Sequence, residues 1–227
     1  FAYVASHDLK EPIRKIVAFS DRLKKKYGGQ LDETATFYLE RMESAGTRMQ
    51  TLIDDLLEYS RVSRNQVDKE QVDMEMVFDT ILDRLEGKIN EKNATIEVLH
   101  LEPIYASPSL ITSLFQNLIH NAMKFVEESK VPKVTIDSKK VVVKNKNYVM
   151  YTVQDNGIGI DKRFSIKIFN IFERLHSKDN YKGTGIGLAI VRRIVEKHNG
   201  LIHVLSDLGK GSIFQVYIPE ENEGKAV

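Results

Sequence analysis

The sequence predicts an α+β protein, in which an N-terminal antiparallel helical hairpin, a four-helix bundle as a dimer, is followed by a two-layer α/β sandwich. Two long stretches with apolar residues at steps of three and four predict the hairpin. After residue 70, short β-rich runs alternate with helical stretches, which is typical of a mixed sheet with helices on one face. We therefore expect domains at 1–65 and 70–222, a linker at 66–69 and a tail at 223–227.

The hairpin is predicted from two apolar seams. The first covers residues 6–27 and ends at Gly28-Gly29, because two glycines favour a turn over a helix. The second covers residues 38–59 and is wide enough for a bundle helix. A lone hairpin leaves part of each wide stripe exposed, so we expect a homodimer that buries both stripes in a four-helix bundle.

The sandwich elements follow in order along the chain. Strands are expected at 95–101, 134–143, 148–154, 202–206 and 212–218, and helices at 74–92, 109–126 and 186–198. Polar turns at 144–147 and 208–211 join neighbouring strands as hairpins.

Composition excludes several classes of function. With 33 basic and 32 acidic side chains the net charge is +1, which supplies no general attraction to nucleic acid, so we expect no nucleic-acid partner. The absence of cysteine excludes disulfides, thiol nucleophiles and thiolate zinc sites. The longest stretch without charged residues, 104–123, is too polar for a bilayer span. We expect a cytoplasmic fragment of a longer protein, whose membrane anchoring stays open.

A first glycine cluster, Asp155-Asn-Gly157-Ile-Gly159, ends an apolar strand. Glycines let the backbone approach a flat or anionic ligand closely, and the carboxylate can accept a hydrogen bond from an exocyclic amine. A glycine turn after a strand is most often only a turn, so this motif alone does not establish a site.

A second cluster, Gly183-Thr184-Gly185-Ile-Gly187-Leu188, comes directly before a predicted helix. Glycines that open a helix present unpaired N–H groups and the positive end of the helix dipole, which favour phosphate. The two familiar phosphate motifs do not fit, because no Gly-Lys-Ser/Thr follows and Leu188 replaces the last glycine of Gly-x-Gly-x-x-Gly.

A third element places Asn117, Asn121 and Lys124 at i, i+4 and i+7 of one helix, and therefore on one face. Two amides and an ammonium suit Mg²⁺ with a triphosphate, because Mg²⁺ takes few protein ligands and lysine offsets phosphate charge. The alternative for such a stripe is an exposed polar face. The three elements in this order favour a nucleotide site.

With these motifs, residues 110–218 resemble the GHKL ATP-binding superfamily of sensor histidine kinases, type II topoisomerases, mismatch-repair ATPases and a heat-shock chaperone. Residues 117–124 resemble its N box, and 155–159, 183–188 and 209–212 its glycine boxes; Phe164, Phe169 and Phe172 resemble the F box of the histidine-kinase branch.

The resemblance implies ATP and Mg²⁺ as ligands and gives each site residue a role. Asp155 would bind the adenine amino group, Asn121 with Asn117 would hold Mg²⁺, and Lys124 and Arg174 would approach the phosphates. Residues 170–182 would form the mobile ATP lid.

One position separates hydrolases from phosphotransferases in this superfamily. Hydrolytic members carry a glutamate four residues before the metal-binding asparagine, whereas this chain has Asn117, which cannot accept a proton at neutral pH. An acceptor other than water is therefore expected. The candidate is His7, whose imidazole is a nucleophile, with Asp8 to fix its tautomer. A surface histidine beside an aspartate is usually without function, and the neighbouring nucleotide site is what favours this one.

In that context residues 1–61 resemble the dimerisation and phosphotransfer domain of sensor histidine kinases, closest to phytochrome-type and multi-sensor kinases, with 6–12 as its H box. The resemblance implies transfer of the γ-phosphoryl group of ATP to His7 and then to an aspartate of a response regulator receiver domain, under an upstream sensor domain. Glu11 stands where phosphatase-competent kinases carry an amide or threonine, so weak phosphatase activity is expected.

Two alternatives stay open, an ATP-hydrolysing conformational switch and a degenerate kinase that serves as a dimeric scaffold. The input signal, the identity of the regulator, and phosphorylation within or between subunits are not determined by the sequence. The other five histidines lack the spacing of a catalytic metal site and are interpreted as structural, with His176 of the predicted lid the one that could face a ligand.

Overall fold

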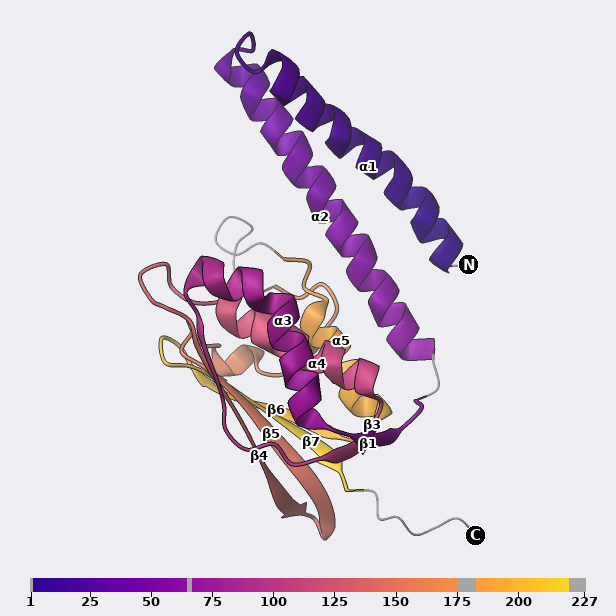
Figure 1. The fold of residues 1–227 in the computed structure, drawn as a ribbon, viewed down its shortest axis with the longest axis vertical. Helices are drawn as coiled ribbons and strands as arrows, with labels where there is room; N and C mark the ends of the chain where they lie inside the picture. The colour runs from indigo at the N-terminus through magenta and orange to yellow at the C-terminus, as the bar shows by residue number, and fades with distance from the viewer. Residues whose placement is uncertain (1, 65–66, 175–182, 221–227) are drawn as a thin grey trace.

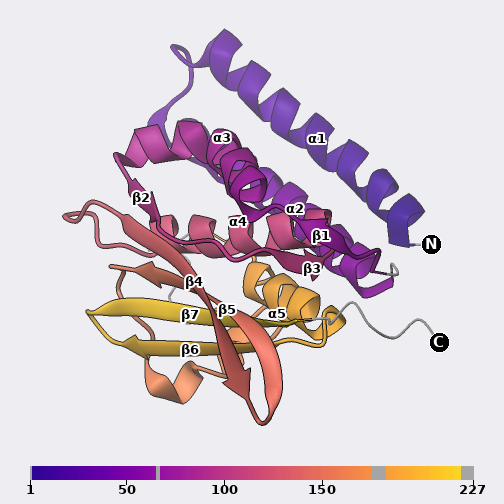
Figure 2. The ribbon, with the colours of Figure 1, turned by 60° about the horizontal axis from the view of Figure 1, so that its bottom comes forward.

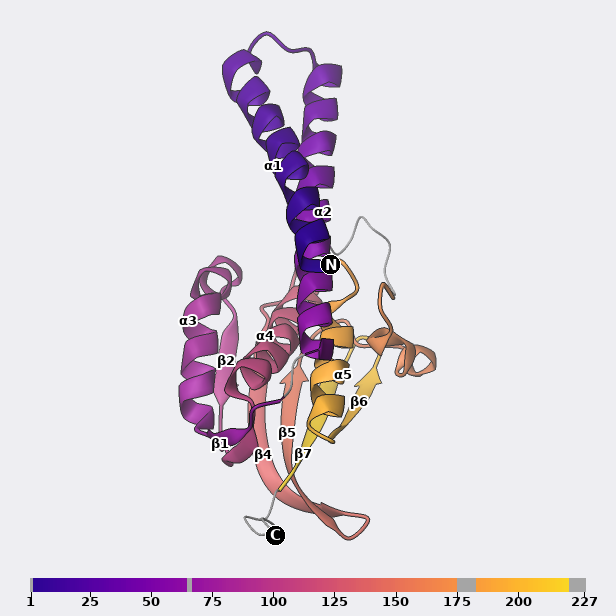
Figure 3. The same ribbon diagram turned by 90° about the vertical axis from the view of Figure 1, so that its right-hand side faces the viewer.

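The computed structural model describes residues 2–64, 67–174 and 183–220, with side chains described from residue 9 onward. Helices α1 (Ala2–Tyr27) and α2 (Glu33–Arg64) form the predicted antiparallel hairpin, which extends beyond an α/β sandwich (Figures 1 and 3). In the described part of the chain, no helix combines the length and the apolar character that a membrane crossing requires.

The hairpin has the turn and the close helix contact that its sequence favours. Helix α1 ends directly before the two glycines, and Asp32 caps α2 by accepting the Ala35 N–H at 2.6 Å. Gly46 is buried at the contact, where an added Cβ would lie 2.4 Å from Cγ2 of Val17. The two helices therefore approach at a point where only glycine fits.

Much of the predicted apolar seam is exposed in a single chain. A small cluster of Ile13, Ile53 and Leu57 is buried between the helices. The seam residues that remain exposed include Leu9, Ile16, Leu23, Tyr27, Tyr38, Met42, Met49 and Leu56. The hairpin thus buries only part of each stripe and leaves large apolar side chains exposed along both helices, as expected for half of a bundle.

The sandwich follows the hairpin in the element order β1 (Glu70–Val72), α3 (Met74–Lys92), β2 (Thr95–Val98), β3 (Ile104–Ala106), α4 (Pro108–Lys124), β4 (Lys133–Val143), β5 (Lys146–Asp155), α5 (Gly187–Lys197), β6 (Leu201–Asp207) and β7 (Gly211–Pro219). Two short 3₁₀ turns, η1 (Lys162–Phe164) and η2 (Lys167–Phe169), lie between β5 and α5.

The main sheet is mixed, in agreement with the prediction. Its strand order is β2-β4-β5-β7-β6, with β2 parallel to β4 and the other neighbours antiparallel. Helices α3, α4 and α5 lie on one face of it (Figure 2). The sequence did not predict the small β1–β3 sheet, because three residues are too few to show alternation.

One strand is shorter than its apolar pattern predicts. We expected a strand over 95–101, but β2 ends at Val98. Beyond it, the backbone N–H groups of His100 and Glu102 donate to the Asp137 and Ser138 side chains, at 3.4 and 2.6 Å, so side-chain bonds replace the ladder.

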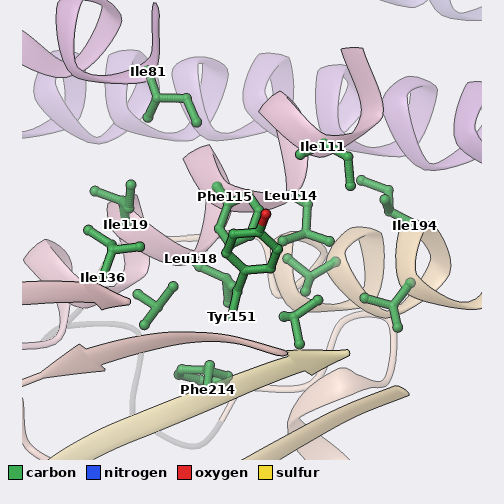
Figure 4. Packing of buried hydrophobic residues seen from close by; sticks show 14 of the residues in the cluster. Ile81, Ile111, Leu114, Phe115, Leu118, Ile119, Ile136, Tyr151, Ile194 and Phe214 are labelled. Carbon is green, nitrogen blue, oxygen red and sulfur yellow. The ribbon is translucent and has the colours of Figure 1, made fainter. Parts of the chain in front are cut away.

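Helix α4 lies at the centre of the core. Its residues Ile111, Leu114, Phe115, Leu118 and Ile119 are at most 1% exposed and face the sheet (Figure 4). The Phe115 ring meets Tyr151 of β5 edge-on at 5.1 Å, and the Tyr151 hydroxyl donates to the backbone carbonyl of Glu102. Val62, near the end of α2, is buried in the same core, so this end of the hairpin is fixed to the sandwich.

Substitution of Gly46 tests the close contact in the hairpin. We expect Gly46→Leu to lower the free energy of unfolding by about 1–3 kcal/mol, because the side chain overpacks against Val17. The matched control is Gly87→Ala on α3, where an added Cβ meets nothing within 4 Å; it should stabilise by about 0.5–1 kcal/mol through helix propensity. Thermal unfolding followed by circular dichroism compares the stability of the two variants. A Gly46→Leu variant as stable as wild type would contradict the close helix contact.

Candidate functional site

A cavity of about 230 Å³ opens where α4, α5 and the end of β5 meet, with α2 along one side. It brings together most of the residues that the sequence predicts as ligand-binding. Asn117, Asn121, Lys124, Asp155, Gly159, Arg174, Thr184, Gly185, Gly187 and Leu188 all line it. The three sequence motifs, which lie up to 71 positions apart, therefore form one site.

Asp155 marks one end of the cavity. Its Oδ1 accepts the backbone N–H groups of Gly157 at 2.8 Å and of Ser212 at 3.0 Å. Burial raises the pKa of this carboxyl, and the two N–H groups oppose the rise. Oδ2 has no hydrogen-bond partner in the described chain, and apolar side chains such as Ile160 and Phe214 line the space beside it. This end fits a flat ring that carries an amino group.

The amides of α4 line the middle of the cavity. Asn117 donates its Nδ2–H to the Ser113 carbonyl at 2.9 Å, which turns its Oδ1 toward α5. A Cβ added at Gly187 would lie 2.8 Å from that oxygen, so the glycine makes room for it. The described residues contain no cluster of three or more histidine and acidic side chains that could hold a metal. Amide oxygens of Asn117 and Asn121 are the ligands that fit Mg²⁺ here.

Two cations lie at the other end. Lys124 is half-buried, and its Nζ would be 2.4 Å from a Cβ added at Gly183. Burial and, next in size, the nearby guanidinium of Arg174 together lower the pKa of Lys124 to about 8. Positive groups crowded into a half-buried space favour an anionic ligand.

The second glycine cluster supplies a helix N-terminus next to these cations. Helix α5 begins at Gly187, after Thr184, whose Oγ1 accepts the Ile186 N–H at 3.4 Å. Gly185 has φ +77°, which only glycine adopts easily, and its carbonyl accepts the Phe172 N–H at 3.0 Å. Gly187 and Leu188 of the first turn of α5 thus line the cavity, and the N–H groups at a helix N-terminus favour phosphate.

Some predicted residues lie beside the cavity or beyond the described part. Gly157 and Gly183 adjoin it without lining it. The backbone of His7 and Asp8 belongs to α1, but their side chains lie outside what is described. Of the predicted lid at 170–182, residues 175–182, including His176, are likewise outside the described residues.

Besides several apolar residues, sequence reasoning missed three polar residues of the cavity wall. Thr51 and Asp55 come from α2, and the Thr184 hydroxyl donates to Oδ2 of Asp55. No local pattern marks them, because their position depends on how α2 packs against a loop 129 residues further along. The third is His120, for which a structural role was predicted. Burial lowers its pKa to about 4, helped by Lys88, whose ammonium lies 3.1 Å from Nε2.

Two family models match the chain. Residues 106–222 match the histidine kinase-, DNA gyrase B-, and HSP90-like ATPase family. Residues 1–65 match the His Kinase A (phospho-acceptor) domain. The first match covers the sandwich from the end of β3 onward, and the second covers the hairpin.

Curated relatives match nearly the whole chain. Cyanobacterial phytochrome A of a Nostoc species is 41% identical over 219 residues, which are 96% of this chain and 28% of the relative. The phytochrome-like protein Cph1 of a Synechocystis species is 40% identical and covers 98% of this chain and 29% of its own. The chain thus spans less than a third of the length of these relatives.

Solved structures share the fold. Full-length ShkA, crystallised in complex with AMPPNP, superposes with a TM-score of 0.70 at 22% identity and covers 100% of this chain and 47% of its own. The histidine kinase AdeS of Acinetobacter baumannii superposes with a TM-score of 0.65 at 24% identity and covers 95% of this chain and 98% of its own.

The lowered pKa of Lys124 predicts a pH-dependent affinity for ATP. A polyphosphate binds the charged ammonium, so affinity should fall as pH rises through about 8, by about tenfold between pH 7 and pH 9. Arg174, Asp55, Lys88 and Lys92 are the other charged groups that act on Lys124. Lys124→Arg keeps its charge across this range and should lose the dependence. Calorimetric titration at several pH values measures both, and a parallel fall in the variant would contradict this assignment.

Proposed function

The chain belongs to the family of histidine kinase-, DNA gyrase B- and HSP90-like ATPases, and on this premise we propose that it is the catalytic core of a two-component sensor histidine kinase. Residues 70–222 act as its ATP-binding domain and residues 1–65 as its dimerisation and phosphotransfer domain. One observation carries the proposal: a single cavity has the Asp155 carboxylate in one part and, in another, Lys124 and Arg174 with a helix N-terminus, beside which the acidic side chain of Asp55 lies. This polarity matches a nucleoside triphosphate.

Each end of the cavity has a defined role in the proposal. The Asp155 carboxylate accepts a hydrogen bond from the adenine amino group. Lys124, Arg174 and the first turn of α5 bind the phosphates, and Asn117 with Asn121 holds Mg²⁺, which neutralises charge on the phosphate oxygens. Gly157, Gly159, Gly183, Gly185, Gly187, Thr184 and Leu188 form the backbone and walls around the ligand.

His7 is the proposed acceptor. A neutral imidazole nitrogen attacks the γ-phosphorus, a P–N bond forms, and the bond from phosphorus to the β,γ-bridging oxygen breaks as ADP leaves. Asp8 stabilises the imidazole as it gains positive charge. The phosphoryl group then passes to an aspartate of a response regulator receiver domain. The position of the superfamily's hydrolytic glutamate is taken by Asn117, which favours this acceptor over water.

Dimerisation is part of the same proposal. A His Kinase A domain implies a dimer, and the exposed apolar stripe of α1 and α2 supports pairing through the hairpin. Two hairpins buried against one another form the four-helix bundle. An upstream sensor domain would act on this bundle.

The test is incubation of the chain with Mg²⁺ and γ-labelled ATP, with wild type and His7→Gln side by side. We expect label on the wild type that is labile in acid and stable in alkali, as a phosphoramidate is, and none on the variant. ATP binding by both proteins is the control for an intact nucleotide site. Equal labelling of the variant would contradict His7 as acceptor, and rapid phosphate release from it would favour the ATP-hydrolysing alternative.

Base selectivity tests Asp155. Wild type should prefer ATP over inosine triphosphate by about tenfold or more, because a 6-oxo group cannot donate to a carboxylate. In Asp155→Asn the side-chain oxygen can keep the Gly157 and Ser212 N–H groups while the new amide donates to the 6-oxo group, so the preference should reverse. Competition binding with the two nucleotides measures the ratio, and an unchanged ratio would contradict the orientation proposed here.

A further inference from the structure

One stripe of α2 faces the sandwich beside the cavity. Thr51, Asp55, Glu58 and Val62 follow one another at steps of four, three and four residues and therefore share a helix face. Thr51 and Asp55 line the cavity, and Val62 is buried in the core of the sandwich. The stripe is the surface by which the hairpin docks on the ATP-binding domain.

Two short hydrogen bonds hold this surface in place. The Thr184 hydroxyl of the second glycine cluster donates to the Asp55 carboxylate. One helical turn along, the Ser113 hydroxyl of α4 donates to the Glu58 carboxylate. Glu58 and Ser113 do not line the cavity, so the second bond anchors the docked helix without reaching the ligand space.

Asp55 lies at the cationic end of the cavity. Lys124 acts on it as the nearby positive charge, and the glycine cluster to which it is bonded opens α5. Burial raises the pKa of Asp55, the Thr184 hydroxyl opposes the rise, and the charges of Glu58 and Asp54 add to it. The carboxylate thus occupies part of the electrostatic environment that a triphosphate needs.

We propose that Asp55 is a built-in competitor of the ATP phosphates, so that docking of α2 and binding of ATP oppose each other. Two anions at one cationic end repel, and the ligand that carries more negative charge binds best when the carboxylate has left. Because Asp55 is part of a continuous helix, its departure moves α2 relative to the sandwich. A signal that shifts the hairpin therefore changes ATP affinity, and ATP in turn undocks the hairpin, because such coupling is reciprocal.

This inference rests on the proposed nucleotide site. If Asp55 were only a structural partner of Thr184, its removal would leave ATP affinity unchanged or lower it. Competition predicts the opposite sign.

The test is calorimetric titration of a non-hydrolysable ATP analogue with Mg²⁺ into wild type and three variants at one pH and salt concentration. Asp55→Asn removes the charge and keeps the shape, and its affinity should rise about fivefold or more. Ser113→Ala weakens docking away from the ligand, and affinity should rise by a smaller factor. The matched control is Asp54→Asn, which removes the same charge from a side chain 58% exposed and paired with Lys10, and it should stay within about twofold of wild type.

The outcomes distinguish failure of the proposed competition by Asp55 from failure of the proposed nucleotide site. Equal or lower affinity in Asp55→Asn, with wild type still binding, overturns the competition and leaves the nucleotide site standing. A rise in Asp55→Asn without any rise in Ser113→Ala overturns the coupling to helix docking. Failure of every protein to bind the analogue overturns the nucleotide site, and the inference with it. Circular dichroism of each variant controls for folding.

Discussion

Helix α4 is held against the sheet by a continuous apolar face, and each residue that it contributes to the cavity takes its position from that contact. Phe115 is fully buried and packs edge-on against Tyr151 at 5.1 Å. With that face fixed, the helical period places Asn117, Asn121 and Lys124 along the cavity. The core packing and the position of the polar groups in the cavity are thus two consequences of one amphipathic helix. A substitution that rotates α4 relative to the sheet displaces all three polar groups together.

The second constraint is electrostatic. Burial and the neighbouring guanidinium of Arg174 lower the pKa of Lys124 in the cavity. The charged form of this lysine is therefore unfavourable unless an anion lies beside it. In the docked hairpin the Asp55 carboxylate supplies part of that negative charge from α2. The positive charge that favours a triphosphate therefore also favours contact with the Asp55 carboxylate. This couples the position of the hairpin to the state of the cavity.

Local sequence information was enough for most of the fold and for the motifs of the site. Periodicity gave α3 at its observed bounds and α4 and α5 to within two residues, and the glycine clusters marked Asp155 and Gly187 as cavity residues. Local sequence information did not predict the features that depend on long-range packing. Asp55 has no motif, and its place in the cavity wall follows only from the docking of α2. The end of β2 at Val98 is likewise decided by side chains of β4 that replace its ladder bonds.

The composition of α4 favours transfer to a protein nucleophile over hydrolysis. The helix brings no carboxylate to the cavity, and the position four residues before Asn121 is an amide whose Nδ2–H is already donated to the Ser113 carbonyl. A water beside the terminal phosphate finds no carboxylate on this helix to take its proton, and His120, whose pKa is lowered to about 4, is only a weak base. An imidazole needs none, because its unperturbed pKa near 6.5 leaves its lone pair available at neutral pH. The missing base is therefore compatible with efficient transfer once the acceptor can reach the nucleotide. Since α1, which carries the proposed acceptor His7, is joined to α2, a movement of the hairpin that frees the cavity from Asp55 would also change the position of the nucleophile, so that one displacement would regulate both steps.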